Sequence, residues 1–290
     1  MQPPALSMSA AGLALLGIGL VAARKEIAAT RGLGKVAALA HLCYALPLAV
    51  FGAEHLSMPQ SMLPLVPSYM PSRMFWVYFV GVALIAASVS IAAKRLVKWS
   101  GLLVGVMMFL FVAMLHLPGA LAQGGRIPWT IVFRESSFGA GGWVLAGSAM
   151  GAGGRGKTLV TIGRVAIALT ALFFGVQHFL HPLGLPGVPL EKQMPVWVPA
   201  RPFIDYLTGA FLLVAAVCFL LGRRTRSAAA ALGAWIGLLV LAIYGPVLIA
   251  ALANPNTGVE IEGLNYFADT LFFVGAILSV AVASEALRSK

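Results

Sequence analysis

The chain has 290 residues, of which 60% are hydrophobic and only 10% are charged. Soluble domains carry about a quarter charged residues, so this composition excludes a water-soluble globular protein and indicates an integral membrane protein. In a soluble protein the net charge of +11 would suggest a nucleic-acid partner. In a membrane protein the charge is instead interpreted loop by loop, on each side of the bilayer, and no nucleic-acid partner is expected.

Apolar runs long enough to cross hydrocarbon recur about nine times along the chain. Their approximate centres are residues 14, 46, 84, 110, 141, 169, 212, 239 and 275. The first run, Leu6 to Ala23, has no basic residue before it and Arg24-Lys25 after it. This pattern favours a retained helix with its N-terminus outside over a cleaved signal peptide. We therefore expect an all-α membrane protein with about nine transmembrane helices.

Basic residues divide unevenly between the two sets of loops. With the N-terminus outside, 15 of the 20 Lys and Arg residues fall on the inner side. Only Glu26 and Glu285 of the nine acidic residues fall there with them. By the positive-inside rule we expect a multi-pass protein of the bacterial inner (plasma) membrane, with a cytoplasmic C-terminus. Polar chemistry is then expected on the outer side.

One stretch of the chain occurs twice. The first copy reads, in order, Pro67, Tyr69, Pro71, Arg73, Phe75, Tyr78 and Gly81. Each has a like residue 128 positions later, from Pro195 to Gly209. Upstream, Phe51-Gly52-x-x-His55 returns as Phe174-Gly175-x-x-His178 at a shift of 123, so the intervening loop is five residues longer in the second copy. Such regularity indicates a duplication.

The duplication predicts the domain organisation. A unit of four helices returns the chain to the side where it began, so the two copies should have the same orientation. We expect a leading helix with its inner loop in residues 1–35. Two parallel four-helix bundles should follow, in residues 36–150 and 151–290.

The glycine-rich stretch Gly151 to Thr158 matches the phosphate-loop pattern G-x-x-x-x-G-K-[ST]. That motif holds phosphate by joining a buried strand to a helix N-terminus, whereas here it joins two predicted transmembrane helices. We interpret the stretch as a flexible basic linker and expect no nucleotide ligand. The cysteines Cys43 and Cys218 lie in apolar runs without a Cys-x-x-Cys pair, which predicts packing roles.

His55 and His178 close the helices that lead into the proline loops. A histidine there can cap orphan carbonyls at the helix end, or it can line a mouth beneath the loop and bind a carbonyl ligand. His178 and His181 share a helix face, but a metal site usually needs three or four convergent ligands, so no metal site is predicted. Arg73 and Arg201 begin the next helices, where they either snorkel to lipid phosphate or clamp an anion or carbonyl.

Four polar residues lie early in the predicted last helices of the two copies: Arg134, Glu135, Asn265 and Asp269. Adjacent residues on a helix do not face each other, so Arg134 and Glu135 should find their partners on other helices. His116 and Tyr244, each two residues before a proline, are candidate partners or helix-end caps. Charges inside a membrane mark candidate functional sites, and a structural interhelical bond is the equal alternative.

Together the Phe-Gly-x-x-His motif, the proline loop and the Arg before a glycine-bearing helix resemble the DoxX-like superfamily, here as a tandem pair. The likeness covers nearly all of residues 36–287 and is stronger in the second copy, since the first has Glu54 and Leu56 in place of Gln177 and Phe179. This superfamily includes membrane subunits linked to quinone reduction, such as the DoxD component of thiosulfate:quinone oxidoreductase. The resemblance implies a quinone and a redox partner subunit as partners besides the lipid bilayer, and no covalently bound cofactor.

Our functional hypothesis is a quinone-associated oxidoreductase subunit that binds a small hydrophobic ligand in polar clefts opening outward. Asp269 and Glu135 are the expected proton carriers. The expected ligand-binding residues are His55, Arg73, His116, His178, His181, Arg201, Tyr206, Tyr244 and Asn265. The principal site is expected in the second copy, where Gln177, His178, His181, Trp197, Arg201 and Asp205 gather at one helix-loop-helix junction. The alternative is a non-catalytic carrier or membrane partner that binds lipid or solute.

The orientation can be tested with single cysteines in the loops near residues 62, 97, 154, 188 and 225. An impermeant thiol reagent added outside should modify the loops near 62 and 188 and spare the other three, because basic residues hold those loops inside. Modification at 154 from outside would contradict the parallel arrangement of the two copies.

Overall fold

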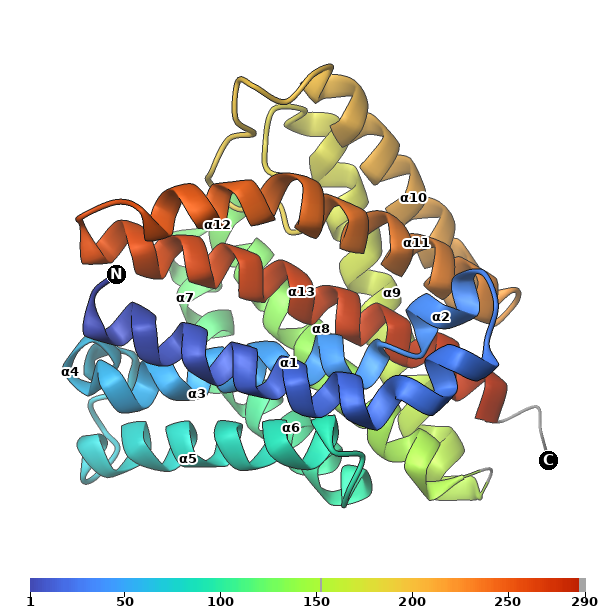
Figure 1. Ribbon diagram of the computed structural model, residues 1–290, viewed down its shortest axis with the longest axis horizontal. Helices are drawn as coiled ribbons and strands as arrows, with labels where there is room; N and C mark the ends of the chain where they lie inside the picture. Colours follow the sequence, from blue (N-terminus) through green and yellow to red (C-terminus); the bar gives the residue numbers. More distant parts are fainter. Residues whose placement is uncertain (152, 287–290) are drawn as a thin grey trace.

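The computed structural model describes residues 1–151 and 153–286 (Figure 1). Ala152 of the glycine-rich linker, and Arg288 and Lys290 of the predicted inner side, lie outside the described residues. The described part of the chain contains no β-strand, only one isolated bridge between Gly184 and Gln193. The all-α prediction is therefore confirmed.

The described residues form nine long helices: α1 Pro3–Ala29, α3 Ala40–Ser57, α5 Arg73–Ala92, α6 Val97–Phe111, α8 Arg126–Met150, α9 Gly154–Leu180, α10 Arg201–Leu221, α11 Thr225–Leu239 and α13 Thr257–Ala286. Shorter elements join or extend them: α2 Leu33–Ala37, α4 Pro59–Met62, the 3-10 turn η1 Leu63–Leu65, the π-helical turns η2 Val112–His116 and η3 Val240–Tyr244, α7 Leu117–Gln123 and α12 Gly245–Leu252. Within the described residues, eight helical segments are long and apolar enough to cross a membrane. The chain is a multi-pass membrane protein.

The ninth long helix, α8, is not among those eight segments. It carries Arg126, Arg134 and Glu135, and its middle, residues 137–142, is entirely buried. A helix that other helices shield from lipid does not need a strongly apolar surface. The charges that weaken the apolar character of α8 therefore face protein.

The duplication is visible in the backbone. Ser72 and Ala200, which precede α5 and α10, are both left-handed, with φ of 49° and 48°. The turns η2 and η3 also lie 128 positions apart, and a proline follows each of them by two residues. Proline removes an N–H from the helical ladder and crowds the preceding turn, which is a common cause of such local widening. The same proline position therefore accompanies the same π-helical turn in both copies.

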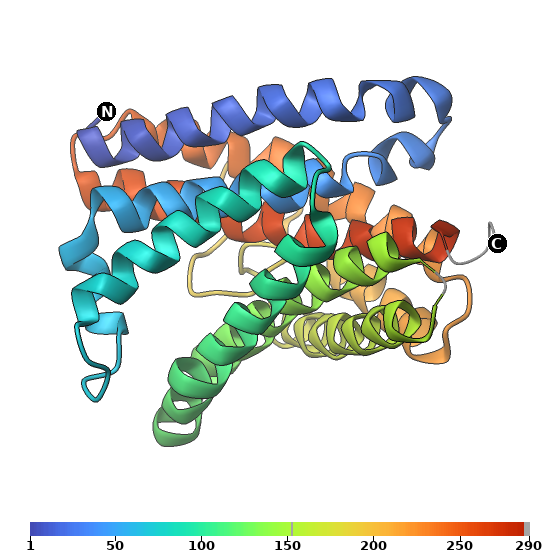
Figure 2. The same ribbon diagram turned by 90° about the horizontal axis from the view of Figure 1, so that it is seen from below.

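The two copies interlock in space. The last helix of each copy packs chiefly on the first helix of the other, α8 on α9 and α13 on α3, and α8 and α13 also pack on each other. The leading helix α1 runs beside α3 and α13 (Figure 1), whereas α6 and α7 are steeply inclined to it (Figure 2). Helices from both copies of the repeat therefore contribute to one continuous core.

Tyr44 of α3 lies where α3, α8 and α13 meet. Its ring is 0% exposed and its hydroxyl donates a 2.6 Å hydrogen bond to the Phe138 carbonyl of α8. A Cβ placed on Gly275 of α13 would lie 2.4 Å from the Tyr44 amide nitrogen. Glycine at this position therefore allows the backbones of α3 and α13 to touch.

We predict that Gly275→Ala lowers stability by about 1–3 kcal/mol, because the added methyl group forces two helix backbones apart. Thermal unfolding in detergent measures the effect. Gly17→Ala on the exposed side of α1 is the matched control, since a Cβ there would meet nothing within 4 Å. Equal melting temperatures for the two variants would contradict the close packing of α3 on α13.

Candidate functional site

A group of buried polar side chains joins α3, α8 and α13. This polar cluster consists of Glu54, Arg134, Glu135, Asn265 and Asp269. The Arg134 guanidinium contacts Asp269 Oδ2 at 2.6 Å through Nη1 and Glu135 Oε1 at 2.9 Å through Nη2. In the same cluster, Asn265 Nδ2 of α13 donates a hydrogen bond to Glu54 Oε1 of α3 at 3.0 Å.

The contact between Arg134 and Glu135 corrects our sequence-based expectation. We expected adjacent residues on one helix not to pair, but the long arginine side chain bends back and reaches both Glu135 and Asp269. The expected partner on another helix, Asp269, is present as well. Arg134 is therefore shared between two carboxylates.

The polar cluster contains more acid than base. Glu54 and Asp269 are 6% and 7% exposed, and the Glu135 side chain 12%, so three largely buried carboxyl groups face one guanidinium. His116 at the end of η2 lies within electrostatic range of Glu135 and Arg134. Excess buried carboxyl groups are compensated by binding protons or a cationic or hydrogen-bonding partner. The cluster is thus suited to exchanging protons.

Two polar atoms of the cluster lack a partner. Arg134 Nε and Asn265 Oδ1 are both buried, and neither makes a hydrogen bond within the described part of the chain. Buried polar atoms in native structures are nearly always paired, and an exception is explained by strain, by a catalytic role or by a bound water or ion. The cluster therefore offers one free donor and one free acceptor.

Another polar site is formed by His178 of α9 and Tyr244 of η3. Because both residues belong to the second copy of the repeat, we call this site the second mouth. His178 is 2% exposed, with Nδ1 2.7 Å from the Phe174 carbonyl and Nε2 accepting from the Gly187 N–H at 2.9 Å. Since a carbonyl only accepts, Nδ1 carries the proton and the imidazole is neutral. The Tyr244 hydroxyl donates to the Pro186 carbonyl at 3.0 Å. One peptide group, Pro186–Gly187, therefore bridges the two side chains.

This peptide group belongs to a buried loop, residues 185–189, between α9 and α10. All five of its residues are buried. Arg126 of α8 supports the loop by donating to the Pro189 carbonyl at 2.8 Å, and Gly187 adopts the glycine-favouring φ of +111°. Irregular backbone inside a membrane protein needs such internal partners. The buried position of Val188 also means that exposed Glu191 is the better site for a topology label.

Asp205 of α10 lies beside the second mouth. It is 1% exposed, with Oδ1 3.7 Å from His178 Nε2. That nitrogen already accepts from Gly187, so it has no proton to offer, and neither carboxyl oxygen has a hydrogen-bond partner among the described residues. The residue 128 positions earlier is Val77. The buried carboxyl is therefore a property of the second copy alone.

The corresponding residues of the first copy are His55 of α3 and His116 of η2, and we call this pair of positions the first mouth. His55 Nδ1 lies 2.8 Å from the Phe51 carbonyl, as in the second copy, which leaves Nε2 as an acceptor. Both histidines are only half-buried, and residues 58–72 of the shorter loop are all half-buried or exposed. In η3 three residues are buried, whereas in η2 none is. No loop of the first copy enters as the buried loop does in the second.

The remaining predicted ligand residues hold the loops or lie at the surface. Arg73 donates to the Val66 and Leu63 carbonyls at 2.9 and 2.7 Å, and Arg201 donates to the Met194 carbonyl at 3.3 Å. His181 is exposed. Tyr206 is 42% exposed and stacks on Phe179. The structure thus brings Glu135, Asn265, Asp269 and His116 together in one region. Arg73, Arg201, His181 and Tyr206 lie outside that region.

Sequence reasoning missed two contributors. Glu54 was not among the predicted site residues, although its position before the motif histidine in a transmembrane run could have marked it. Arg126 supports the buried loop from α8, and no short-range pattern indicates that contact. No group of three or more His, Cys, Asp or Glu suited to a metal ion occurs within residues 1–151 and 153–286.

Comparison with known proteins is informative for one part of the chain. A family model described as a domain of unknown function, DUF8561, matches residues 42–126. The match runs from α3 to the first residue of α8 and includes Glu54, His55 and His116. No curated protein and no solved structure matches the chain. The DoxX-like resemblance therefore stays a prediction.

We predict that Arg134→Met lowers the free energy of unfolding by about 3–5 kcal/mol, because Glu135 and Asp269 would remain buried without their cation. Unfolding in detergent measures this, and Asp269→Asn with the double variant completes a mutant cycle. Lys192→Met is the control, since the Lys192–Glu262 pair, 33% and 46% exposed, should contribute only about 0–1 kcal/mol. Similar small losses for both cations would show that Arg134 is not the central partner.

Proposed function

We propose that the protein is the membrane subunit of a quinone-linked oxidoreductase, which binds a quinone at the first mouth and exchanges protons with it through the polar cluster. The observation that carries the proposal is the peptide group between His178 and Tyr244 in the second mouth. It presents a carbonyl to one side chain and an N–H to the other. We infer that a ligand with matching groups takes the corresponding place at the first mouth, where residues 58–72 form no buried loop.

His55 and His116 have the chemistry that such a ligand needs. His55 Nε2 is left as an acceptor because Nδ1 is bonded to Phe51, so it suits a hydroxyl of a quinol. His116 has ring nitrogens that can donate to a carbonyl, as the Tyr244 hydroxyl does in the other copy. The pair therefore suits a ring that carries oxygen on opposite edges.

Proton exchange is assigned to the polar cluster next to this mouth. Reduction of a quinone consumes two electrons and two protons, and oxidation of the quinol releases them. Glu135 and Asp269 share the Arg134 guanidinium and lie in electrostatic contact with His116 or with Glu54. This arrangement supports proton transfer between the mouth and the membrane surface. The electrons are assigned to a redox partner subunit.

This proposal moves the principal site from the second copy to the first. The second mouth was expected to bind the ligand, but its histidine and tyrosine are already engaged by the buried loop. We assign the second copy a structural role and the first copy the binding role. The proposed location is a bacterial inner membrane, with the mouths on the outer side and the C-terminus in the cytoplasm.

The second candidate function is a carrier that binds a hydrophobic solute or lipid without redox chemistry. It is favoured by the position of the polar cluster at the interface of two parallel repeats, which is where many transporters hold their substrate. The two functions differ in one property. A quinone-linked subunit binds quinone with an affinity that depends on His116 and Glu135, whereas a carrier of other solutes does not.

We predict that His116→Phe or Glu135→Gln weakens the binding of a short-chain benzoquinone to the purified protein by about five- to a hundredfold. Loss of one buried hydrogen-bond partner costs about 1–3 kcal/mol, which corresponds to that range. Equilibrium titration of the quinone in lipid nanodiscs gives the dissociation constants.

Tyr244→Phe is the matched control in the other copy. It removes the hydroxyl that holds Pro186 and should lower the melting temperature while leaving the quinone dissociation constant unchanged. A larger effect of Tyr244→Phe than of His116→Phe would return the site to the second mouth. Absence of saturable quinone binding by the unmodified protein would exclude the quinone function and leave the carrier.

A further inference from the structure

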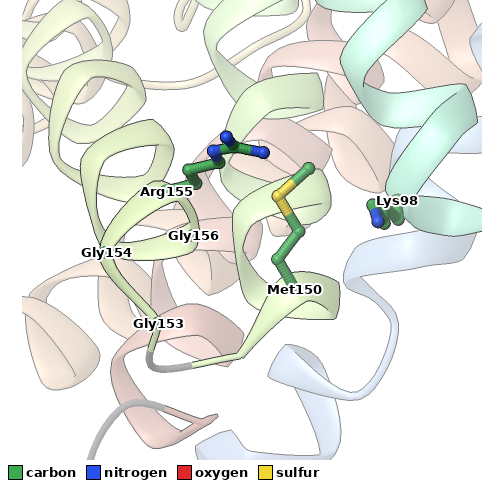
Figure 3. A pocket seen from close by; sticks show the side chains of 6 residues that line it. All are labelled: Lys98, Met150, Gly153, Gly154, Arg155 and Gly156. Atoms are coloured by element: carbon green, nitrogen blue, oxygen red, sulfur yellow. The ribbon is translucent and has the colours of Figure 1, made fainter.

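The end of the molecule opposite the two mouths consists of the loops 30–32, 93–96 and 222–224 and the start of α9, and we call it the basic end. A groove lies at this basic end. The groove runs between the start of α6 and the junction of α8 with α9. One hollow of about 310 Å³ is lined by Lys98, Met150, Gly153, Gly154, Arg155 and Gly156 (Figure 3). An overlapping hollow of about 700 Å³ continues past Trp99, Leu102, Thr158 and Leu159.

The mouth of the groove is cationic. Lys98 and Arg155 come from different helices, and both side chains are exposed. Within the described residues neither forms an ion pair, although Lys98 Nζ lies 4.9 Å from the centre of the Trp99 ring. Two unpaired cations across one hollow attract an anion to the space between them.

The far part of the groove is apolar. Leu102 of α6 and Leu159 of α9 are half-buried, and the Trp99 ring is 55% exposed beside them. Tryptophan at the end of a membrane span lies at the level of lipid headgroups. A cationic entrance that continues into an apolar wall matches an amphiphile with an anionic head and a hydrocarbon tail.

One glycine of this region, Gly156, serves helix packing. Gly156 is buried, and a Cβ there would lie 2.3 Å from the Gly151 carbonyl oxygen and 2.8 Å from that of Gly147. A glycine is therefore required so that α9 can cross α8, whatever binds nearby. Gly156 of the phosphate-loop match therefore has a packing explanation, and α8, not a strand, leads into α9.

We propose that the groove binds one anionic phospholipid, with its phosphate between Lys98 and Arg155 and an acyl chain along Leu102 and Leu159. Basic pockets between membrane helices commonly bind anionic headgroups. A nucleotide has no hydrocarbon tail for the apolar wall. The site is independent of the quinone proposal, because it lies at the other end of the molecule.

The test compares full-length protein in nanodiscs of phosphatidylcholine alone with nanodiscs that also contain phosphatidylglycerol. Native mass spectrometry of the released protein should show one retained phosphatidylglycerol. The melting temperature should be higher in the anionic lipid, because a ligand that binds only the folded state stabilises it. Lys98→Gln combined with Arg155→Gln should weaken retention of phosphatidylglycerol by about tenfold or more.

Arg24→Gln combined with Lys25→Gln is the control. It removes the same charge from exposed positions of the same end. The proposal requires that this variant retain phosphatidylglycerol as the unmodified protein does, and that all variants melt alike in phosphatidylcholine. Equal losses in both double variants would mean diffuse attraction to the surface and would overturn the site. Displacement of the lipid by inorganic phosphate or ATP at equal concentration would overturn the choice of a lipid.

Discussion

The ion pair between Arg134 and Asp269 is the interaction on which the arrangement of the helices depends. It joins α8 to α13, the last helices of the two copies, at a distance of 2.6 Å in a largely buried setting. Exposing either charge to hydrocarbon is costly, so α8 and α13 must face each other and be enclosed by the remaining helices. Around this pair, α8 packs on α9 and α13 packs on α3.

Duplication explains why two similar mouths exist, and one insertion explains why they differ. Five extra residues in the second copy allow the chain between α9 and α10 to enter the protein, where His178 and Tyr244 bind its backbone. The first copy keeps the histidine and the π-helical turn but has no such segment. The histidine and tyrosine of the second copy are therefore engaged by the chain itself, whereas His55 and His116 of the first copy are half-buried.

Several features were predictable because they depend on neighbours along the chain. Apolar length indicated the membrane spans, and the 128-residue spacing indicated two like units. The left-handed residues Ser72 and Ala200 share that spacing. The charges on α8 and α13 were recognised as needing partners on other helices. The contact between Arg134 and Glu135 was excluded wrongly, because the rule for adjacent residues describes short side chains better than a long, flexible arginine.

The sequence by itself determined the all-α membrane fold class, the approximate positions of the long helices and most polar residues of the candidate sites. These properties follow from hydropathy and periodicity, which act over one helix at a time. Only the tertiary structure decided that Glu54 meets Asn265, that Arg126 supports the buried loop and that the second mouth is filled from within. Those contacts join residues that are distant along the chain, and they depend on which glycines let helices approach closely enough for particular side chains to meet.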